Sequence, residues 1–265
     1  MSFSVSMSVY AKENASYLRQ CLDSLASQTL PPSEVVLVED GEITKELADV
    51  ISYYSDFLPI KNVRLERNQG LAAALNIGLE HCSNELIARM DTDDVCLPNR
   101  FARQVAFMQN NPDISVSSAW IVEMNQSMTG AGVLKMLPES HADVMSFSKL
   151  RNPINHPVSI FRKSSVLLVG GYPLIYPEDY ALWAFMLTSG FKFANIPEVL
   201  LKMRTGEDFI SRRGMGFFKK EIVLLRYFRS IGFFGLKESA YYFLTRLFLR
   251  VSPPKIRMMI YKSSR

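Results

Sequence analysis

Short apolar segments alternate with helical patterns along the first 110 residues, and this alternation restricts the fold more than any other feature of the sequence. The patterns predict strands at residues 3–10, 34–38, 63–66 and 86–90, and helices around residues 18–25, 47–54, 71–81 and 99–109. Strands that alternate with helices form parallel sheets with helices on both faces. The sequence therefore predicts a Rossmann-like α/β fold with a mostly parallel sheet and flanking helices.

Acidic residues follow two of these strands. Glu39 and Asp40 come after the second strand, and residues 91–94 (Asp-Thr-Asp-Asp) come after the fourth. The strands of a parallel sheet all point the same way, so both groups should lie at its carboxyl edge, where such sheets bind ligands. Carboxylates there suit a hard divalent cation such as Mg²⁺ or Mn²⁺, or the hydroxyl groups of a sugar. The alternative interpretation is that these acids only form turns or cap the following helices.

Tyr10 and Asp40 end neighbouring strands at the same edge, where a ring and a carboxylate suit a nucleotide base. The chain has no G-x-G-x-x-G motif and no Walker-type loop, so glycine-loop amides are not the expected phosphate ligands. A metal ion is expected to neutralise the phosphates instead.

Residues 111–213 lose the regular alternation. Apolar patterns predict strands at residues 114–124, 158–161 and 191–194, and a helix at residues 180–188 that follows Glu178 and Asp179. We expect the rest of this half to form acceptor-side loops rather than a second core. Glu178 and Asp179 suit either a helix cap or a role in catalysis.

The C-terminal part is strongly basic. Residues 204–265 contain 14 Lys and Arg and 4 Asp and Glu, a net charge of +10, whereas the rest of the chain has 16 basic and 22 acidic residues, a net charge of −6. Phe and Leu recur at helical spacing from about residue 217, which predicts basic amphipathic helices that lie on an anionic membrane surface. The alternative is that their apolar faces pack on the domain. No nucleic-acid-binding motif accompanies the charge, so a nucleic-acid partner is not expected.

The composition agrees with an intracellular enzyme. The chain has 265 residues, of which 48% are hydrophobic, enough for a full core. Its three cysteines, Cys21, Cys82 and Cys96, have no C-x-x-C spacing, which predicts a reducing compartment without a disulfide framework or a zinc site. We find no signal-peptide pattern and no run of 18 apolar residues.

Several short motifs occur in an order that resembles glycosyltransferase family 2, with its GT-A fold, over about residues 3–213. The matching segments are residues 5–10 (VSMSVY), 36–41 (VLVEDG), 68–71 (NQGL), 91–94 (DTDD), 98–101 (PNRF), 170–172 (GGY) and 178–179 (ED). The chain is most similar to the bacterial subgroup that builds the repeat units of O-antigen and exopolysaccharides, the amylovoran type.

The resemblance implies a role for each matching residue. The expected nucleotide-sugar contacts are Tyr10 and Asp40 at the base, Arg67 or Asn68 closing the pocket, Asp91 on ribose or sugar hydroxyls, Thr92 within the same motif, Asp94 as a further donor contact, and Arg212 and Arg213 on the diphosphate. Asp93 would hold Mn²⁺ or Mg²⁺. Asp179 would be the catalytic base, and Glu178 would support it.

The implied function is an inverting, metal-dependent transfer of one hexose, galactose or glucose from UDP, onto a lipid-linked N-acetylhexosamine-diphosphoundecaprenol, in a β-1,3 linkage. The Gln-x-x-Arg-Trp motif of processive members is absent, which favours a single transfer. Relatives often carry a histidine after the arginine at the Arg204 position, whereas Thr205 stands here, so the last metal ligand stays open.

The expected domains are residues 1–213, with a nucleotide-binding half (1–110) and an acceptor half (111–213), and a membrane-interface tail (214–265). The expected location is the cytoplasmic face of the bacterial inner membrane, as a peripheral protein. Two alternatives are a sugar-nucleotide nucleotidyltransferase, which should have a glycine-rich loop where Lys12 and Glu13 stand, and an inactive membrane scaffold.

Overall fold

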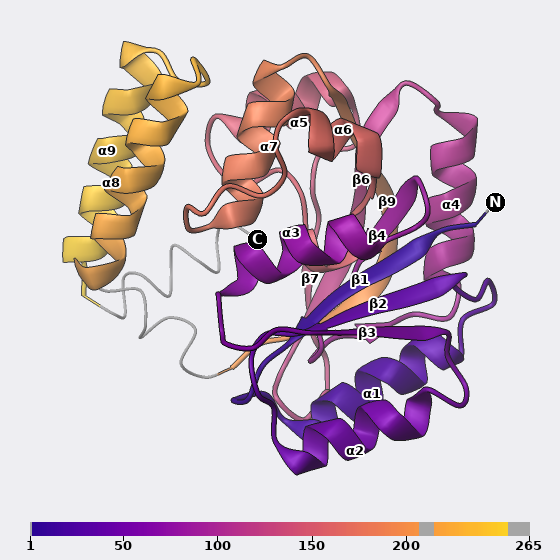
Figure 1. Ribbon diagram of the computed structural model, residues 1–265. Helices are drawn as coiled ribbons and strands as arrows, with labels where there is room; N and C mark the ends of the chain where they lie inside the picture. Colours follow the sequence, from indigo (N-terminus) through magenta and orange to yellow (C-terminus); the bar gives the residue numbers. More distant parts are fainter. Residues whose placement is uncertain (1, 207–214, 254–265) are drawn as a thin grey trace.

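The structure is a computed structural model that describes residues 2–206 and 215–253 (Figure 1). The strands are β1 (Ser4–Val9), β2 (Glu34–Glu39), β3 (Ile60–Arg64), β4 (Leu86–Arg89), β5 (Val95–Cys96), β6 (Ile114–Met124), β7 (Val133–Lys135), β8 (Ile160–Arg162) and β9 (Lys192–Arg204). The helices are α1 (Ala15–Ala26), α2 (Lys45–Tyr54), α3 (Leu71–His81), α4 (Arg100–Asn110), α5 (His141–Ser148), the 3₁₀ turn η1 (His156–Val158), α6 (Lys163–Leu168), α7 (Glu178–Thr188), α8 (Met215–Ser230) and α9 (Leu236–Val251).

The described strands form one mixed sheet in the order β3-β2-β1-β4-β8-β6-β9-β5, and β7 pairs with β6. The first four strands are parallel, as the sequence predicts, and β6 and β9 are also parallel to each other. β8 runs antiparallel to both of its neighbours, β4 and β6, and so joins the strands of the second half to those of the first half in one sheet. The α/β fold is confirmed, with a sheet that is mixed rather than mostly parallel.

Helices cover both faces of this sheet, and the alternation of side chains along β2 shows why. Val35 and Leu37 face the core under α1, α2 and α4, whereas Val36 and Val38 face the core under α3 and α7. All four side chains are fully buried, which explains the continuous apolar run of this strand.

The strands and the helix predicted within residues 111–213 are present as β6, β8, β9 and α7, whereas the expectation that this half has no second core is wrong. These residues add β6, β8 and β9 to the same sheet, and they provide α7, whose Trp183 is fully buried against Phe161 and Phe193. Because β8 is antiparallel to both of its neighbours, this half departs from the strict alternation of parallel strands and helices.

The helices α8 and α9 form an antiparallel pair beside α7 (Figure 1). Phe228 of α8 is fully buried against Tyr180 of α7, with ring centroids 4.9 Å apart, and Tyr242 of α9 belongs to the same core. A buried ion pair also joins the two helices, because Arg250 donates to both oxygens of Glu221 at 2.9 and 2.6 Å. The predicted tail helices are therefore present, and one side of the pair belongs to the packed domain.

Candidate active site

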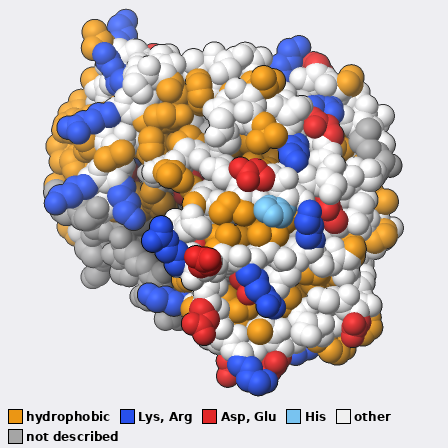
Figure 2. All heavy atoms as spheres, in the orientation of Figure 1, with side chains coloured by type: hydrophobic (Ala, Val, Ile, Leu, Met, Phe, Trp, Pro, Cys, Tyr) orange, Lys and Arg blue, Asp and Glu red, His pale blue; other side chains and the backbone are white. Residues whose placement is uncertain are grey.

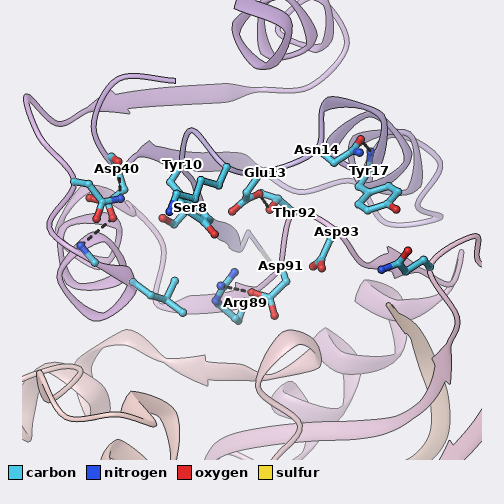
Figure 3. A pocket seen from close by; sticks show the side chains of 15 residues that line it. Ser8, Tyr10, Glu13, Asn14, Tyr17, Asp40, Arg89, Asp91, Thr92 and Asp93 are labelled. Carbon is cyan, nitrogen blue, oxygen red and sulfur yellow. Dashed lines mark hydrogen bonds and ion pairs between the residues drawn. The ribbon is translucent and has the colours of Figure 1, made fainter. Parts of the chain in front are cut away.

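A cavity of about 740 Å³ opens at the carboxyl ends of β1, β2 and β4 (Figure 3). The residues that line it are Ser8, Tyr10, Lys12, Glu13, Asn14, Tyr17, Asp40, Asn68, Gly70, Leu71, Arg89, Asp91, Thr92, Asp93 and Gln126. Cavities of this size hold ligands as large as nucleotides. The sequence prediction that the acids after β2 and β4 share one edge of the sheet is therefore correct.

The loop after β4 carries Asp91 and Asp93 into this cavity. The amide of Met90 still donates to the carbonyl of Ser6 in β1, at 3.1 Å, so the loop leaves the sheet only at Asp91. The Asp91 carboxylate forms an ion pair with the buried guanidinium of Arg89. Thr92 is buried, and its hydroxyl donates to the carboxylate of Glu13 from the loop after β1.

Asp94 lies behind the cavity. Its side chain is 1% exposed, it is absent from the lining, and its Oδ1 accepts a 2.8 Å hydrogen bond from the amide of Arg204. The expected donor-sugar contact of Asp94 is therefore not supported by its position. The burial makes it a support for the end of β9, because its carboxylate fixes the backbone there.

Arg204 joins the end of β9 to the acidic loop. Its Nε donates to the carbonyl of Asp93 at 2.9 Å, its guanidinium lies over the ring of Tyr17 at 3.8 Å, and it also donates to Gln20 at 2.8 Å. Arg204 thus binds the backbone carbonyl of Asp93, and the side chain of Asp93 remains available to the cavity.

The acids around the cavity repel one another. Burial and the neighbouring Asp91 raise the pKa of Asp93 to about 6, and burial together with Asp91 and Asp93 raises the pKa of Glu13 to about 8. Burial also raises the pKa of Asp94 well above its usual value. Burial and mutual repulsion thus both disfavour the ionised forms of these acids, and a bound cation would relieve that repulsion.

This donor set fits a divalent metal ion that is shared with a ligand. Among the described residues, no three His, Cys, Asp or Glu side chains are grouped so that they could hold a metal by themselves. Mg²⁺ and Mn²⁺ commonly use one or two protein carboxylates and take their remaining ligands from phosphates and water. Asp93, with Asp91 beside it, meets that requirement.

The opposite end of the cavity has the predicted base-binding residues. Tyr10 is 41% exposed and lines the opening. Asp40 is buried, and its carboxylate accepts from the amides of Gln69 and Gly70 at 2.6 and 3.0 Å. Asp40 thus fixes the entry to α3, and it still borders the cavity.

Asn68 lines the cavity, and its side chain donates to the carbonyl of Asp40 at 3.1 Å. Gly41 allows this close approach, because a Cβ at its φ of +85° would lie 2.6 Å from the amide nitrogen of Asn68. Arg67 is exposed and does not line the cavity. Of the two residues expected to close the pocket, the structure brings Asn68 to it.

A second acidic group lies at the start of α7. Glu178 is buried, and burial together with the charge of Asp179 raises its pKa to about 7. Burial also raises the pKa of Asp179, while hydrogen bonds from the amide of Tyr180 and from Asn152 oppose the rise. The charge of Asp91 contributes to the raised pKa of both acids, which indicates that the α7 acids lie near the donor side of the site.

Three functional candidates were not found from the sequence. Glu13 could have been found, because it stands in the loop that follows β1 at the ligand-binding edge. Arg89 also gave a signal, since a charge within an apolar strand needs a buried partner. Asn152, which donates to Asp179 at 2.6 Å, gave none, because only the fold brings the two residues together.

His156 is buried, and its Nε2 lies 3.1 Å from the hydroxyl of Tyr172, so it packs in the core. Arg212 and Arg213 lie outside the described residues, and their expected contact with the diphosphate stays a prediction.

A carboxylate pair in a nucleotide-sized cavity at the carboxyl edge of a mixed α/β sheet, with a buried acid pair close enough to feel the charge of Asp91, suits an enzyme that transfers a group from a nucleotide. The family model "Glycosyl transferase family 2" matches residues 4–165, and the chain belongs to this family. The family expected from the sequence motifs is thereby confirmed.

Two relatives match this chain over nearly its whole length. "Amylovoran biosynthesis glycosyltransferase AmsE" of Erwinia amylovora is 41% identical over 265 residues, which cover 99% of each chain. "UDP-Gal:alpha-D-GlcNAc-diphosphoundecaprenol beta-1,3-galactosyltransferase" of Escherichia coli is 37% identical over 262 residues, which cover 98% of this chain and 95% of that one.

Two solved structures share the fold. S. aureus TarS 1–349 in complex with UDP superposes with a TM-score of 0.68 at 19% identity, covering 94% of this chain and 72% of that chain. The mannosyltransferase PcManGT of Pyrobaculum calidifontis, in complex with GDP-Man and Mn²⁺, has a TM-score of 0.66 at 15% identity, covering 99% of this chain and 79% of that chain.

Proposed function

We propose that this family 2 glycosyltransferase is an inverting, metal-dependent enzyme that transfers one hexose from UDP to a lipid-linked acceptor. The observation that carries the proposal is the position of Asp91 and Asp93 in the cavity, with Glu178 and Asp179 of α7 close enough for the charge of Asp91 to raise the pKa of both. One acidic group suits the donor diphosphate and the other suits proton removal from an acceptor. A direct displacement needs both groups and no covalent nucleophile.

The donor half of the site binds and orients the nucleotide sugar. Tyr10 and Asn68 receive the base, and Asp91 receives the hydroxyl groups of ribose or of the sugar. Asp93 would hold Mn²⁺ or Mg²⁺, which as a Lewis acid offsets the charge that develops on the departing diphosphate. Arg212 and Arg213 are the expected further contacts of the diphosphate.

The acceptor half of the site removes a proton. Asp179 takes it from the attacking hydroxyl, because an alcohol is a weak nucleophile until a positioned base accepts its proton. Glu178 supports Asp179 as the neighbouring acid. Its raised pKa favours the protonated form near neutral pH, which reduces its repulsion of an ionised Asp179. One displacement on the face opposite the leaving group inverts the anomeric centre.

The proposed substrates are based on the printed name of one relative. The printed name of the Escherichia coli relative specifies UDP-galactose, a GlcNAc-diphosphoundecaprenol acceptor and a β-1,3 linkage. We propose the same classes for this chain, namely galactose or glucose from UDP and an N-acetylhexosamine-diphosphoundecaprenol, in O-antigen or surface-polysaccharide biosynthesis. The absence of the Gln-x-x-Arg-Trp motif supports a single transfer.

We also propose that α8 and α9 place the enzyme on an anionic membrane, at the cytoplasmic face of the bacterial inner membrane. Within residues 2–206 and 215–253, no helix combines the length and the apolar character needed to cross a bilayer. Leu244, Phe248 and Val251 of α9 are exposed by 58–62% at helical spacing. Figure 2 shows basic side chains among apolar ones over the surface where Figure 1 places these helices. Apolar groups beside basic ones suit an interface of acyl chains and lipid phosphates.

The test of the reaction is a screen of UDP-galactose and UDP-glucose with a synthetic GlcNAc-diphosphate-lipid, with Mn²⁺ and with EDTA. We expect transfer with one of the donors, a β-linked product and loss of activity in EDTA. Calorimetric titration with UDP separates the alternatives. A protein that fails to bind millimolar UDP in Mn²⁺ would be the scaffold, and one that forms UDP-sugar from UTP and a sugar phosphate would be the nucleotidyltransferase.

A further inference from the structure

Arg89 is a buried cation in the wall of the donor cavity. It is the last residue of β4, its side chain is 1% exposed, and it lies between the parallel neighbour β1 and the antiparallel neighbour β8. Its Nη2 pairs with Oδ1 of Asp91, and its Nη1 donates to the backbone carbonyls of Ser6, at 3.4 Å, and Met90. The guanidinium is thus fixed on one side to the sheet and on the other side to Asp91 (Figure 3).

The contacts of Arg89 show how it acts. Its buried Nε has no hydrogen-bond partner among the described residues, and the side chain as a whole is shielded from the solvent in the cavity. A ligand in the cavity therefore meets Asp91, which borders the open space, before it meets Arg89. Although Arg89 borders the cavity, it is 1% exposed and holds the Asp91 carboxylate, so its main effect on a ligand is expected to pass through that carboxylate.

The charge of Arg89 is shared by acids from both halves of the site. It opposes the increase in pKa of Glu13, Asp93 and Asp94 on the donor side and of Glu178 on α7. A fixed positive charge at this point reduces the repulsion among acids that would otherwise resist being packed together.

We propose that Arg89 is a positioning residue for the donor, which orients the Asp91 carboxylate toward the nucleotide sugar from a fixed point on the sheet. This inference rests on the proposed function, in which Asp91 contacts the donor. The planar fork of arginine reaches two backbone carbonyls and a carboxylate at once, which the single ammonium group of lysine cannot do with the same geometry. The identity of the residue therefore matters in addition to its charge.

A purely structural role makes a different prediction. If Arg89 only fastened the ends of β1 and β4, its loss would lower the stability of the fold and would affect catalysis independently of Asp91. If it acts through Asp91, its loss matters little once the Asp91 carboxylate is gone. A double-mutant cycle separates these cases, because residues that act through one another give non-additive effects.

The experiment uses the full chain with UDP-galactose, or UDP-glucose if the screen selects it, and the GlcNAc-diphosphate-lipid acceptor. The variants are Arg89→Met, Arg89→Lys, Asp91→Asn and the Arg89→Met/Asp91→Asn double variant. We expect Arg89→Met to raise the KM for the donor by about 10- to 100-fold and to change the KM for the acceptor by less than about twofold, since displacement of a positioning group by about 1 Å costs up to this much. Arg89→Lys should recover only part of the loss.

The coupling is the decisive result. The donor kcat/KM of the double variant should be at most about threefold lower than that of the less active single variant, because both changes remove the same donor contact. Arg162→Met is the matched control, since Arg162 also donates to backbone carbonyls, those of Ile114 and Met108 at 3.0 Å, on the strand beside β4. Its effect should leave the donor KM within about twofold and should multiply with that of Asp91→Asn.

Thermal melting and calorimetric titration with UDP and Mn²⁺ are measured for each variant. If melting shows that Arg89→Met is unfolded, Arg89→Lys provides the test in its place. If the wild type is active, two results overturn this inference alone. One is a normal donor KM in both Arg89→Met and Arg89→Lys, and the other is that the losses of Arg89→Met and Asp91→Asn multiply in the double variant. A wild type that neither binds UDP nor transfers sugar overturns the proposed function and this inference with it.

Discussion

Asn152 donates a 2.6 Å hydrogen bond from its side-chain amide to Oδ2 of Asp179. The orientation of this amide is fixed, because its oxygen accepts from the backbone amide of Ile154 at 3.2 Å. The nitrogen must then point to Asp179, and a donor at that place stabilises the ionised carboxylate that a base requires. In the proposed mechanism, this hydrogen bond from the loop before η1 favours the ionised form of Asp179 that proton removal requires.

Replacing Asp179 with asparagine should remove catalysis and spare donor binding. Asp179 does not line the donor cavity, so its loss leaves the contacts of UDP in place. A general base contributes about 10²- to 10⁴-fold to a rate, and we expect kcat for the Asp179→Asn variant to fall by that factor. Steady-state kinetics and UDP titration measure the two effects. Asp113→Asn, an exposed acid paired with Lys192, is the control. Near-normal turnover of Asp179→Asn would show that another group is the base.

Replacing Asn152 with alanine should move the acidic limb of the kcat profile to higher pH. Burial raises the pKa of Asp179, and the Asn152 hydrogen bond opposes that rise, as does the charge of Lys135. Without the bond the pKa of Asp179 rises further, so the base is lost by protonation at a higher pH. The loss of activity should therefore be larger at pH 6 than at pH 8. The control is Asn111→Ala, whose side chain donates to the carbonyl of Phe107 at 2.9 Å. A uniform loss at all pH values would contradict the role of the hydrogen bond.

Replacing Glu13 with glutamine should make the stability of the metal-free protein less dependent on pH. The pKa of Glu13 is about 8 in the folded protein against a usual value of 4.5, so the folded state keeps a proton that the unfolded state has lost between these values. Stability therefore falls as the pH rises from about 4.5 to 8, and glutamine removes this loss. We expect Tm at pH 8 to rise relative to wild type, by about 2–4 °C for each kcal/mol, with little change at pH 5.

Thermal melts in EDTA at the two pH values measure this difference. Glu80→Gln, at an exposed position on α3, is the control and should follow the wild type. An equal change in Tm at both pH values for Glu13→Gln would contradict the assignment.

Replacing Leu244 and Phe248 with serine should weaken membrane binding. Both side chains are more than half exposed on α9, so their loss leaves the core intact while it removes apolar surface for acyl chains. We expect binding to anionic liposomes to fall by about 10- to 100-fold in flotation assays. Leu167→Ser/Leu168→Ser on α6 is the control, with two apolar side chains exposed by 47% and 78%. Deletion of the whole helix pair is a poorer test, because Phe228 would leave the core beside Tyr180. Equal flotation of the two double variants would remove the interface proposal.

The first half of the fold could be predicted because its signals are local. Asn14 caps α1 by accepting from the amides of Ser16 and Tyr17, and α3 spans the predicted residues 71–81. The continuous apolar run of β2 reflects burial on both faces of the sheet, and this run can be seen in neighbouring residues of the sequence. Asp91, Asp93 and Tyr10 line one cavity as predicted for a related reason, since parallel strands must end at one edge, and their roles stay predictions.

The second half was predicted less well because its elements depend on distant partners. β5 and β7 are two and three residues long, and each exists only because a longer strand, β9 or β6, offers it hydrogen bonds. β9 is longer than its apolar pattern suggests, because β6 pairs with it through several register shifts.

The sequence by itself determined the α/β class, the acidic edge of the sheet and the family, since strand order along the chain and the spacing of short motifs are written in neighbouring residues. Only the tertiary structure decided which acid lies in the cavity and which lies in the core. Asp94 differs from Asp93 by one position, yet it is turned into the core toward the amide of Arg204, while Asp93 faces the cavity. Arg89 and Asn152 acquire their roles from contacts across the sheet with residues that the sequence does not mark as partners, because hydrogen bonds between distant segments form only after the strands are in register.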